Sequence, residues 1–301
     1  MTWLWIPLTI AAAFLQNVRS SLQKHLKSQL GTTGATFVRF GYGVPFAIAY
    51  LIILVTLFDF DSPTPNARFL LFVIAGGITQ IAGTAFLLTL FDARNFAVGT
   101  AYSKTETVQA AIFAVVFLGE TISLLATIGI LISLVGVMVI STARGPANPP
   151  SITRSWSARS ALIGLASGAS FGIAAVSYRG ASLSLSGDGF LVQAAFTLAF
   201  VLVLQTFVMA VYMALRNPIE LHQVLKAWRV AIWVGASGAI ASIGWFTAMT
   251  IQNAALVRAL GQIELVFTIG ASVIIFREKI LRLELLGITL VISGIIVLLL
   301  R

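Results

Sequence analysis

The sequence predicts an all-α integral membrane protein with ten transmembrane helices, arranged as two inverted repeats of five. Hydrophobic residues make up 58% of the 301 residues and charged residues only 10%, whereas a soluble domain has about 25% charged residues. The apolar residues fall in runs of about 18 to 25, long enough for a helix to cross a hydrocarbon core about 30 Å thick. In addition, the two halves of the chain repeat one pattern of polar and small residues.

The composition excludes several functional classes. The net charge of +9 comes from basic residues scattered singly between the apolar runs, without the basic, aromatic-rich segments typical of nucleic-acid binding. There is no cysteine, so disulfides and thiolate metal sites are excluded. A phosphate-binding Gly-rich loop and His-Glu-x-x-His are absent from the sequence. Gly-x-Ser-x-Gly occurs once, at residues 168–172, inside a predicted apolar span and not at a strand-to-helix turn. We therefore expect no cofactor, no metal ion, no enzymatic activity and no nucleic-acid partner.

The predicted spans are apolar runs between charged or Gly- and Pro-rich breaks. They cover residues 3–22, 35–57, 69–91, 96–118, 122–140, 161–178, 190–215, 230–249, 254–276 and 281–300. The first span continues into a polar stripe at helical spacing, Gln16, Arg19, Gln23 and Lys27, which should face protein or water. Pro45 should free a carbonyl inside the second span and can kink it.

The longest break, 141–159, contains Arg-Gly-Pro and Asn-Pro-Pro, which neither helix nor strand tolerates well. It predicts a five-helix domain at 1–142, a linker at 143–159 and a second five-helix domain at 160–301.

The two halves correspond at a constant offset of 158 residues. The matched pairs are Gly77 and Gly235, Asn95 and Asn253, Ala97 and Ala255, Glu106 and Glu264, Glu120 and Glu278, Gly129 and Gly287, and Gly136 and Gly294. Such an ungapped register indicates internal duplication. Because five is odd, the second repeat must enter the membrane with the opposite orientation, and inverted repeats of this kind build alternating-access transporters.

The basic residues predict an orientation. With ten spans, the odd-numbered connections hold Lys24, Lys27, Arg94, Arg144, Arg154, Arg159, Arg216, Lys226, Arg229, Arg277, Lys279 and Arg282, and the other side holds Arg68, Arg179 and Arg301. The positive-inside rule then places the first group in the cytoplasm and both termini outside.

The second, fourth and fifth spans carry a family resemblance. The fourth ends in Phe-Leu-Gly119-Glu120 and the fifth continues through Leu124, Gly129 and Gly136; the pattern recurs at 254–300, where Phe276-Arg277-Glu278 replaces the usual Gly-Glu. Together with the Arg39-Phe40 pair, these residues resemble the drug/metabolite transporter superfamily, specifically the EamA-type transporters. The resemblance implies a ten-helix secondary transporter, often an exporter of amino acids and other metabolites, with cytoplasmic termini. That orientation is opposite to the one the basic residues predict.

Glu106 and Glu264 are the leading site candidates. Each lies about ten residues into a predicted helix of about 23, near the bilayer midplane at 1.5 Å per residue. A carboxylate at that depth can bind a proton or a cationic solute group, or it can form an ion pair that fixes helix packing.

Basic groups break the symmetry that these glutamates keep. Lys104 corresponds to Gln262, and Arg258 corresponds to Thr100. A site with both signs of charge suits a zwitterion or an organic acid, but two helix-locking salt bridges would give the same pattern. Further candidates for contact with a solute are Arg39, Gln109, Gln262, Tyr42, Tyr102 and Trp245. We expect Asn95, Asn253, Glu120 and Glu278 to be structural, with the glutamates opening the fifth and tenth helices.

The leading interpretation is a multi-pass protein of the cell (inner) membrane, monomer or homodimer, surrounded by lipid. It would move a small metabolite, such as an amino acid or organic acid, by alternating access, as an exporter and with a proton as candidate coupling ion. A lipid-linked-sugar flippase of similar fold and a non-transporting scaffold or receptor are the alternatives.

Overall fold

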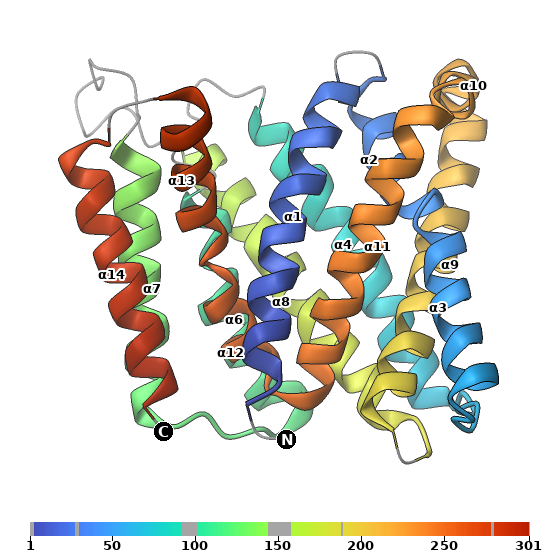
Figure 1. Cartoon of the computed structure of the whole chain (residues 1–301), viewed down its shortest axis with the longest axis horizontal. Helices are drawn as coiled ribbons and strands as arrows, with labels where there is room; N and C mark the ends of the chain where they lie inside the picture. Colours follow the sequence, from blue (N-terminus) through green and yellow to red (C-terminus); the bar gives the residue numbers. More distant parts are fainter. Residues whose placement is uncertain are drawn as a thin grey trace. The chain divides into compact units, whose positions relative to one another are not determined.

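The computed structural model of the chain describes residues 3–27, 30–91, 101–143, 158–187, 189–277 and 280–300 (Figure 1). Helices are the only regular secondary structure in those residues. The chain divides into two compact units. Unit 1 contains Met1–Ile78 and Ser177–Gln252, and unit 2 contains Thr79–Val176 and Asn253–Arg301. Each unit therefore takes residues from both halves of the sequence.

Seven helical segments in the described part are long and apolar enough to span a membrane. They are Thr33–Leu57, Ala67–Leu90, Leu124–Ala143, Arg159–Ser184, Phe190–Arg216, Trp228–Ile251 and Arg282–Leu299. Three predicted spans are not among them. The first carries the polar stripe around Arg19, and the described parts of the fourth and ninth consist of helices of 13 residues or fewer. The count of ten spans therefore stays a prediction.

Unit 1 contains α1 (Trp5–Lys27), α2 (Thr32–Gly41), α3 (Val44–Leu57), α9 (Phe190–Arg216), α10 (Pro218–Lys226) and α11 (Trp228–Ile251). It also includes the start of α4 (Ala67–Phe91) and the end of α8 (Ala158–Ser184). Helices α1 and α11 lie side by side (Figure 1). Gly244 permits this approach, because a Cβ atom there would lie 2.9 Å from the Cβ of Ala12.

The second predicted span is interrupted just before Pro45. Helix α2 ends at Gly41 and α3 begins at Val44, so Pro45 lies in the first turn of α3. The backbone N–H that proline lacks would have no helical partner there. Gly235 of α11 packs directly against the backbone of Tyr42 at the break. At the expected proline kink the helix is thus interrupted for two residues, Tyr42 and Gly43, and a glycine of α11 packs against the interruption.

Helix α10 was missed by the sequence analysis, which treated residues between α9 and α11 as a connection. Pro218 starts the helix and the Asn217 side chain accepts a hydrogen bond from the Glu220 N–H, at 3.3 Å. Only Glu220 and Val224 of this helix are buried. They lie four residues apart and therefore on the same face.

Arg179 lies within α8 rather than in the predicted connection. Its guanidinium Nη1 donates to the carbonyl oxygens of Met249, Thr250 and Gln252, at 2.6, 3.1 and 2.8 Å. These carbonyls belong to the end of α11, where helical carbonyl groups lack partners and the helix dipole favours a positive charge. Hydropathy alone ended the predicted span at Arg179 because the residue is charged. In the structure the helix continues, because the guanidinium is hydrogen-bonded to carbonyl oxygens at the end of α11.

Replacing Arg179 with glutamine is expected to lower the thermal stability of the purified protein. Hydrogen bonds from a charged donor contribute about 1.5–3 kcal/mol, and the variant keeps at most part of this set. Arg159→Gln is the matched control, because Arg159 is exposed in the first turn of the same helix. Equal unfolding temperatures for the two variants, measured by tryptophan fluorescence, would show that the Arg179 contacts contribute nothing.

Unit 2 contains α6 (Glu106–Leu118), α7 (Leu124–Ala143), α12 (Ala254–Gly261), α13 (Glu264–Phe276) and α14 (Arg282–Leu299), with the end of α4 and the start of α8. Helices α7 and α14 are paired along their length (Figure 1). A Cβ atom on Gly129 would lie 2.6 Å from the carbonyl oxygen of Gly294, and one on Gly136 would lie 2.7 Å from that of Gly287. Since rising numbers in α7 meet falling numbers in α14, the two helices are antiparallel.

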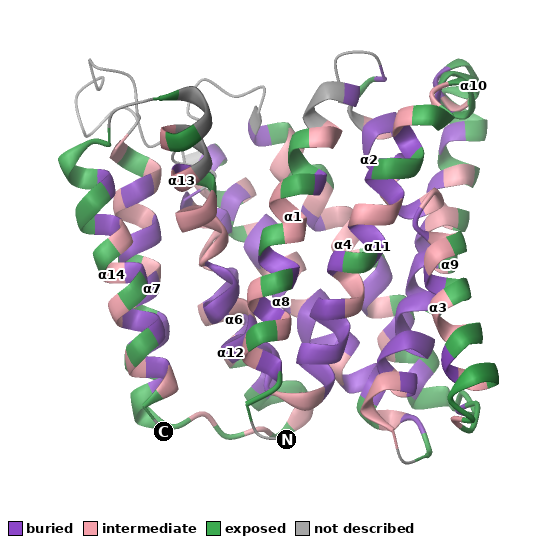
Figure 2. Ribbon diagram, in the orientation of Figure 1, coloured by how far each residue is buried: buried purple, intermediate pink, exposed green. Residues whose placement is uncertain are grey.

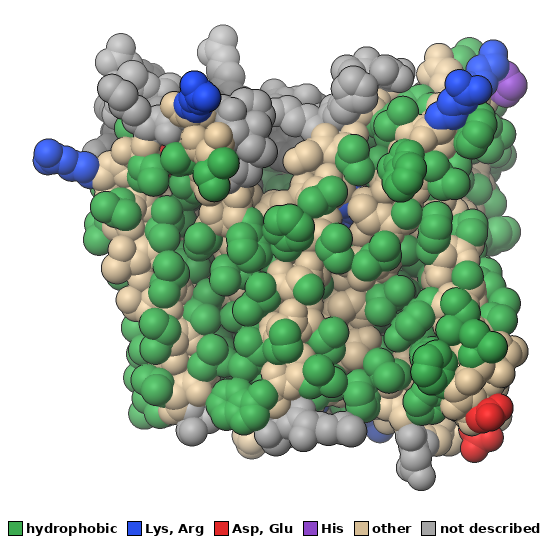
Figure 3. Space-filling model, in the orientation of Figure 1, with side chains coloured by type: hydrophobic (Ala, Val, Ile, Leu, Met, Phe, Trp, Pro, Cys, Tyr) green, Lys and Arg blue, Asp and Glu red, His purple; other side chains and the backbone are tan. Residues whose placement is uncertain are grey.

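The surfaces of the helices suit a lipid environment. Exposed large hydrophobic residues occur on nearly every helix, including Leu71 and Ile74 on α4 and Leu215 at the end of α9. In Figure 2 exposed and buried positions alternate around single helices, and in Figure 3 the visible face is mostly hydrophobic, with charged side chains at its margins.

Candidate functional site

Two helix interruptions in unit 2 position the candidate site. Residues 104–105 form a turn before α6, and residues 262–263 form a turn between α12 and α13. These turns are separated by the repeat offset of 158 residues. In each, backbone N–H groups bond three residues back, as from Lys104 to Ala101 at 3.2 Å and from Gln262 to Ala259 at 3.2 Å.

The interruptions change the expected setting of the two glutamates. Glu106 is the first residue of α6 and Glu264 is the first residue of α13, so neither lies in the middle of a continuous helix as predicted. Each glutamate therefore stands at the N-terminal end of a helical segment.

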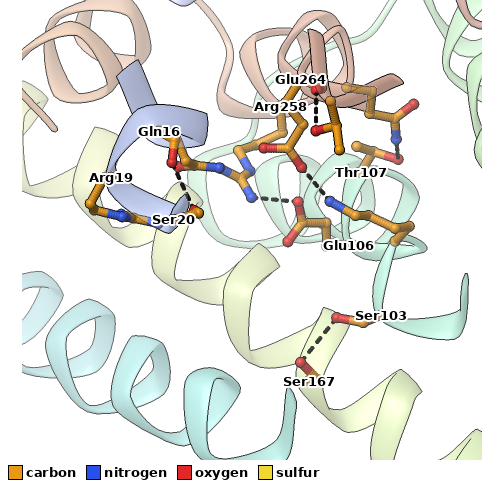
Figure 4. Close-up of polar contacts among 12 residues, drawn as sticks. Gln16, Arg19, Ser20, Ser103, Glu106, Thr107, Ser167, Arg258 and Glu264 are labelled. Carbon is orange, nitrogen blue, oxygen red and sulfur yellow. Dashed lines mark hydrogen bonds and ion pairs between the residues drawn. The ribbon is translucent and has the colours of Figure 1, made fainter. Parts of the chain in front are cut away.

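Four charged side chains of unit 2 form two crossed ion pairs (Figure 4). The Arg258 Nη2 atom donates to Glu106 Oε1, and the Lys104 Nζ atom donates to Glu264 Oε1. We call these four residues the charge quartet. Their side chains are largely buried, with exposed fractions of 9% for Glu106, 17% for Glu264, 20% for Arg258 and 22% for Lys104. Buried charges are retained in proteins when they are paired in this way.

Each ion pair joins the two halves of the sequence. Lys104 and Glu106 are two residues apart, yet each bonds to a residue more than 150 positions away. The glutamates are related by the repeat offset, whereas the cations are not: Arg258 corresponds to position 100, one helical turn before Lys104. Each glutamate thus has a cation from the opposite half, but the two cations come from non-equivalent positions.

Small residues of α8 allow the backbone of the first interruption to pack closely. A Cβ atom on Gly168 would lie 2.9 Å from the Ser103 carbonyl oxygen and 3.2 Å from the Glu106 nitrogen. The Ser103 and Ser167 hydroxyls are 3.0 Å apart, and Ser167 Oγ donates to the Gly83 carbonyl of α4 at 3.0 Å. The interruption therefore packs against α8, and α8 is in turn hydrogen-bonded to α4. Sequence reasoning missed this hydroxyl pair, because a lone Ser gives no recognisable signal.

The neutral candidates of unit 2 lie at the two interruptions or within about one helical turn of them. Gln262, which forms part of the second interruption, donates from Nε2 to Thr107 Oγ1 at 3.2 Å. Gln109 donates to Thr105 Oγ1 at 2.8 Å. Tyr102 lies in the turn before Lys104, where its carbonyl accepts from the Thr105 hydroxyl at 2.6 Å.

The remaining candidates, Arg39, Tyr42 and Trp245, belong to unit 1. Arg39 lies in the last turn of α2, with its Cζ atom 5.3 Å from the Phe40 ring centroid. Tyr42 follows α2, and its hydroxyl donates to the Val224 carbonyl of α10 at 3.2 Å. Trp245 is buried in α11.

Unit 1 also contains a buried charge from the polar stripe of the first span. Arg19 is buried in α1, and its Nη2 atom lies 3.5 Å from Ser20 Oγ, which donates to the Gln16 carbonyl at 2.7 Å (Figure 4). The prediction that the stripe faces protein or water is confirmed for Arg19, and Gln23 donates to the Ala35 carbonyl at 2.8 Å.

Glu120 does not open the fifth helix as expected, because α7 begins four residues later, at Leu124. Its Oε2 atom accepts a hydrogen bond from Asn253 Nδ2 at 2.6 Å. Asn253 in turn caps α12 by accepting from the Ala255 N–H at 2.8 Å. The predicted capping role of Asn253 is confirmed, while Asn95 and Glu278 lie outside the described residues.

The chain is similar to one family of known proteins in sequence and to a solved structure in fold. Residues 3–142 match the model of the EamA-like transporter family. A solved structure described as "Crystal structure of protein" is similar to the chain over 97% of its length and 95% of the other chain, with 16% sequence identity and a TM-score of 0.72. At that identity the likeness concerns the fold alone. None of the curated proteins compared matches the sequence.

Proposed function

Because the chain carries an EamA-like transporter family domain across residues 3–142, and is thereby a member of the drug/metabolite transporter superfamily, we propose that it is a secondary active transporter of a small, charged metabolite. The proposed direction is export across the cell (inner) membrane, by alternating access between two five-helix inverted repeats. The observation that carries the proposal is the charge quartet at the two matched helix interruptions.

The quartet favours a solute with both positive and negative groups. Its two carboxylates and two cations already satisfy one another, so a solute with a single uncompensated charge would leave a buried partner unpaired. A zwitterion such as an amino acid can replace both partners of one pair, with its ammonium group at a glutamate and its carboxylate at Arg258 or Lys104. Charge inside the site is then conserved during binding.

Helix interruptions support transport rather than a scaffold role. Interrupted helices in transporters present half-helix ends to solutes and coupling ions near the membrane midplane. The antiparallel packing of α7 against α14 is also what an inverted repeat requires, since these helices are related by the same 158-residue offset. A scaffold would gain no advantage from charged groups at both interruptions, which are expensive within a membrane.

A thermal-shift panel tests the proposal on the purified full chain. Zwitterionic amino acids are expected to raise the unfolding temperature, because a ligand that binds only the folded state stabilises it by mass action. Neutral sugars of similar size are the comparison. The best stabilising compound should also exchange across liposome membranes that contain the protein. Stabilisation by sugars alone, or by no class of small solute, would contradict the proposed charge-quartet site.

A further inference from the structure

Helix α10 and the residues that flank it expose an apolar surface bordered by basic side chains. The exposed fractions are 72% for Ile219, 59% for Leu225 and 53% for Trp228. The inward face of α10 is formed by Glu220 and Val224, so the helix is amphipathic. Short amphipathic helices of this kind lie in the plane of the membrane interface, with their apolar side chains at the level of the headgroups.

Three exposed cations stand at the helix ends that meet here. Arg216 ends α9, Lys226 ends α10 and Arg229 lies in the first turn of α11. The Arg229 Cζ atom is 5.7 Å from the centroid of the Trp228 ring. Basic side chains gather at the α10 corner of the visible face in Figure 3. We call this set, with Ile219 and Leu225, the α10 surface.

The acidic residue of α10 does not neutralise these cations. Glu220 points inward, where its Oε1 atom accepts from the Gly34 N–H of α2 at 2.6 Å and its Oε2 atom accepts from Asn217 Nδ2 at 2.8 Å. A Cβ atom on Gly34 would lie 2.9 Å from Glu220 Oε1, so glycine makes room for the carboxylate. The charge that α10 presents outward is therefore positive.

Two contacts fix α10 in place before any ligand binds. The Glu220 carboxylate holds it to the start of α2, and the Tyr42 hydroxyl donates to the Val224 carbonyl at 3.2 Å. The orientation of the α10 surface is thus set by unit 1 itself. A preorganised surface loses less conformational entropy on binding.

We propose that the α10 surface binds the headgroups of anionic phospholipids. Charge complementarity identifies the ligand. Three cations beside an aromatic ring attract a phosphodiester with a net negative charge. A choline headgroup is less suitable, because its own positive charge cancels that of its phosphate. The exposed Ile219, Leu225 and Trp228 side chains require an apolar partner next to that phosphate, and acyl chains supply it. The positive-inside rule predicts that all three cations face the cytoplasm, where the leaflet is rich in anionic lipid. This inference does not depend on the proposed transport function.

The test compares phosphatidylglycerol with phosphatidylcholine, each added to the full chain in detergent. Bound lipid is counted by native mass spectrometry and the unfolding temperature is measured in parallel. Phosphatidylglycerol is expected to bind more tightly and to raise the unfolding temperature more. In Arg216→Gln/Lys226→Gln/Arg229→Gln, its apparent affinity should fall roughly 100-fold, about fivefold for each charge removed.

The control variant is Arg68→Gln/Arg159→Gln/Arg282→Gln, which removes three exposed cations at other helix ends and should keep the preference. Salt provides a second measurement on the unaltered protein: 0.5 M NaCl should weaken binding of phosphatidylglycerol and not of phosphatidylcholine, because surface charges are screened. Equal loss in both triple variants, or a salt-independent preference, would overturn the proposal. So would equal stabilisation by glycerol phosphate without acyl chains, which would identify a site for a soluble anion.

Discussion

Replacing Glu106 with glutamine is expected to reduce solute flux in liposomes roughly 10- to 100-fold, because the solute loses a hydrogen bond to a charged group worth about 1.5–3 kcal/mol and every 1.4 kcal/mol is a factor of ten. Glutamine keeps the size of the side chain but leaves the Arg258 guanidinium without its carboxylate. The solute used would be the compound that stabilises the protein best in the thermal-shift panel. Proton movement driven by that solute, measured with a pH-sensitive dye inside the liposomes, should disappear together with the flux if Glu106 carries the coupling proton.

Two further variants distinguish a loss of solute binding from a loss of folding stability. Glu120→Gln removes another carboxylate of unit 2 while leaving an oxygen to accept from Asn253, so it should retain flux and stability. Glu106→Gln/Arg258→Gln removes both charges of one pair and should recover the folding stability that the single variant loses, while flux stays low. If the double variant also recovers flux, the pair serves only to fix helix packing, and the proposed role of the quartet in solute binding is wrong.

Replacing Gly136 with alanine is expected to destabilise the protein, although alanine is the better helix former. The added Cβ atom would lie 2.7 Å from the carbonyl oxygen of Gly287 and 2.7 Å from the nitrogen of Val291. Both are backbone atoms of α14, so the helices must separate rather than one side chain rotate. Overpacking of this kind costs about 1–3 kcal/mol.

Gly270→Ala is the matched control in the same unit. Gly270 lies within α13, and no heavy atom would lie within 4 Å of a Cβ atom placed there. The intrinsic preference of helices for alanine over glycine, about 1 kcal/mol, should make this variant equal to or more stable than the parent. Unfolding temperatures in detergent that follow the same direction in both variants would show that the close α7–α14 contact does not limit stability.

Much of the membrane architecture could be predicted from the sequence, because a helix that crosses lipid needs an uninterrupted run of apolar residues. Such a run can be recognised from neighbouring residues alone. The seven described segments long and apolar enough to span a membrane all correspond to predicted spans. The same reasoning singled out Glu106 and Glu264, since intramembrane carboxylates are rare, and the structure pairs each of them with a cation. Arg179 was misplaced because a window of hydropathy registers its charge but not the three carbonyl groups of α11 that satisfy it.

The geometry of the candidate site could not be predicted in the same way. The interruptions at 104–105 and 262–263 contain no proline, and local propensity does not distinguish them from continuous helix. They depend on tertiary contacts, such as the backbone of Ser103 against Gly168. The ion pairs join residues more than 150 positions apart, so helical spacing could exclude a Lys104–Glu106 pair but could not identify the true partners. Helix α10 was missed because its one buried face is too short to give a clear period.

The two cations of the charge quartet occupy non-equivalent positions in the two halves, so the quartet lacks the two-fold symmetry of its glutamates. If the halves descend from one duplicated segment, the two glutamates are the inherited part, and a site built from them alone would look the same after a half-turn. An asymmetric solute could then enter in either of two equivalent poses. Lysine from one helix and arginine from a position one turn away on its counterpart remove that equivalence, because their lengths, shapes and donor geometries differ. The proposed site would therefore distinguish head from tail in its solute, although the two halves of the chain share one pattern of residues.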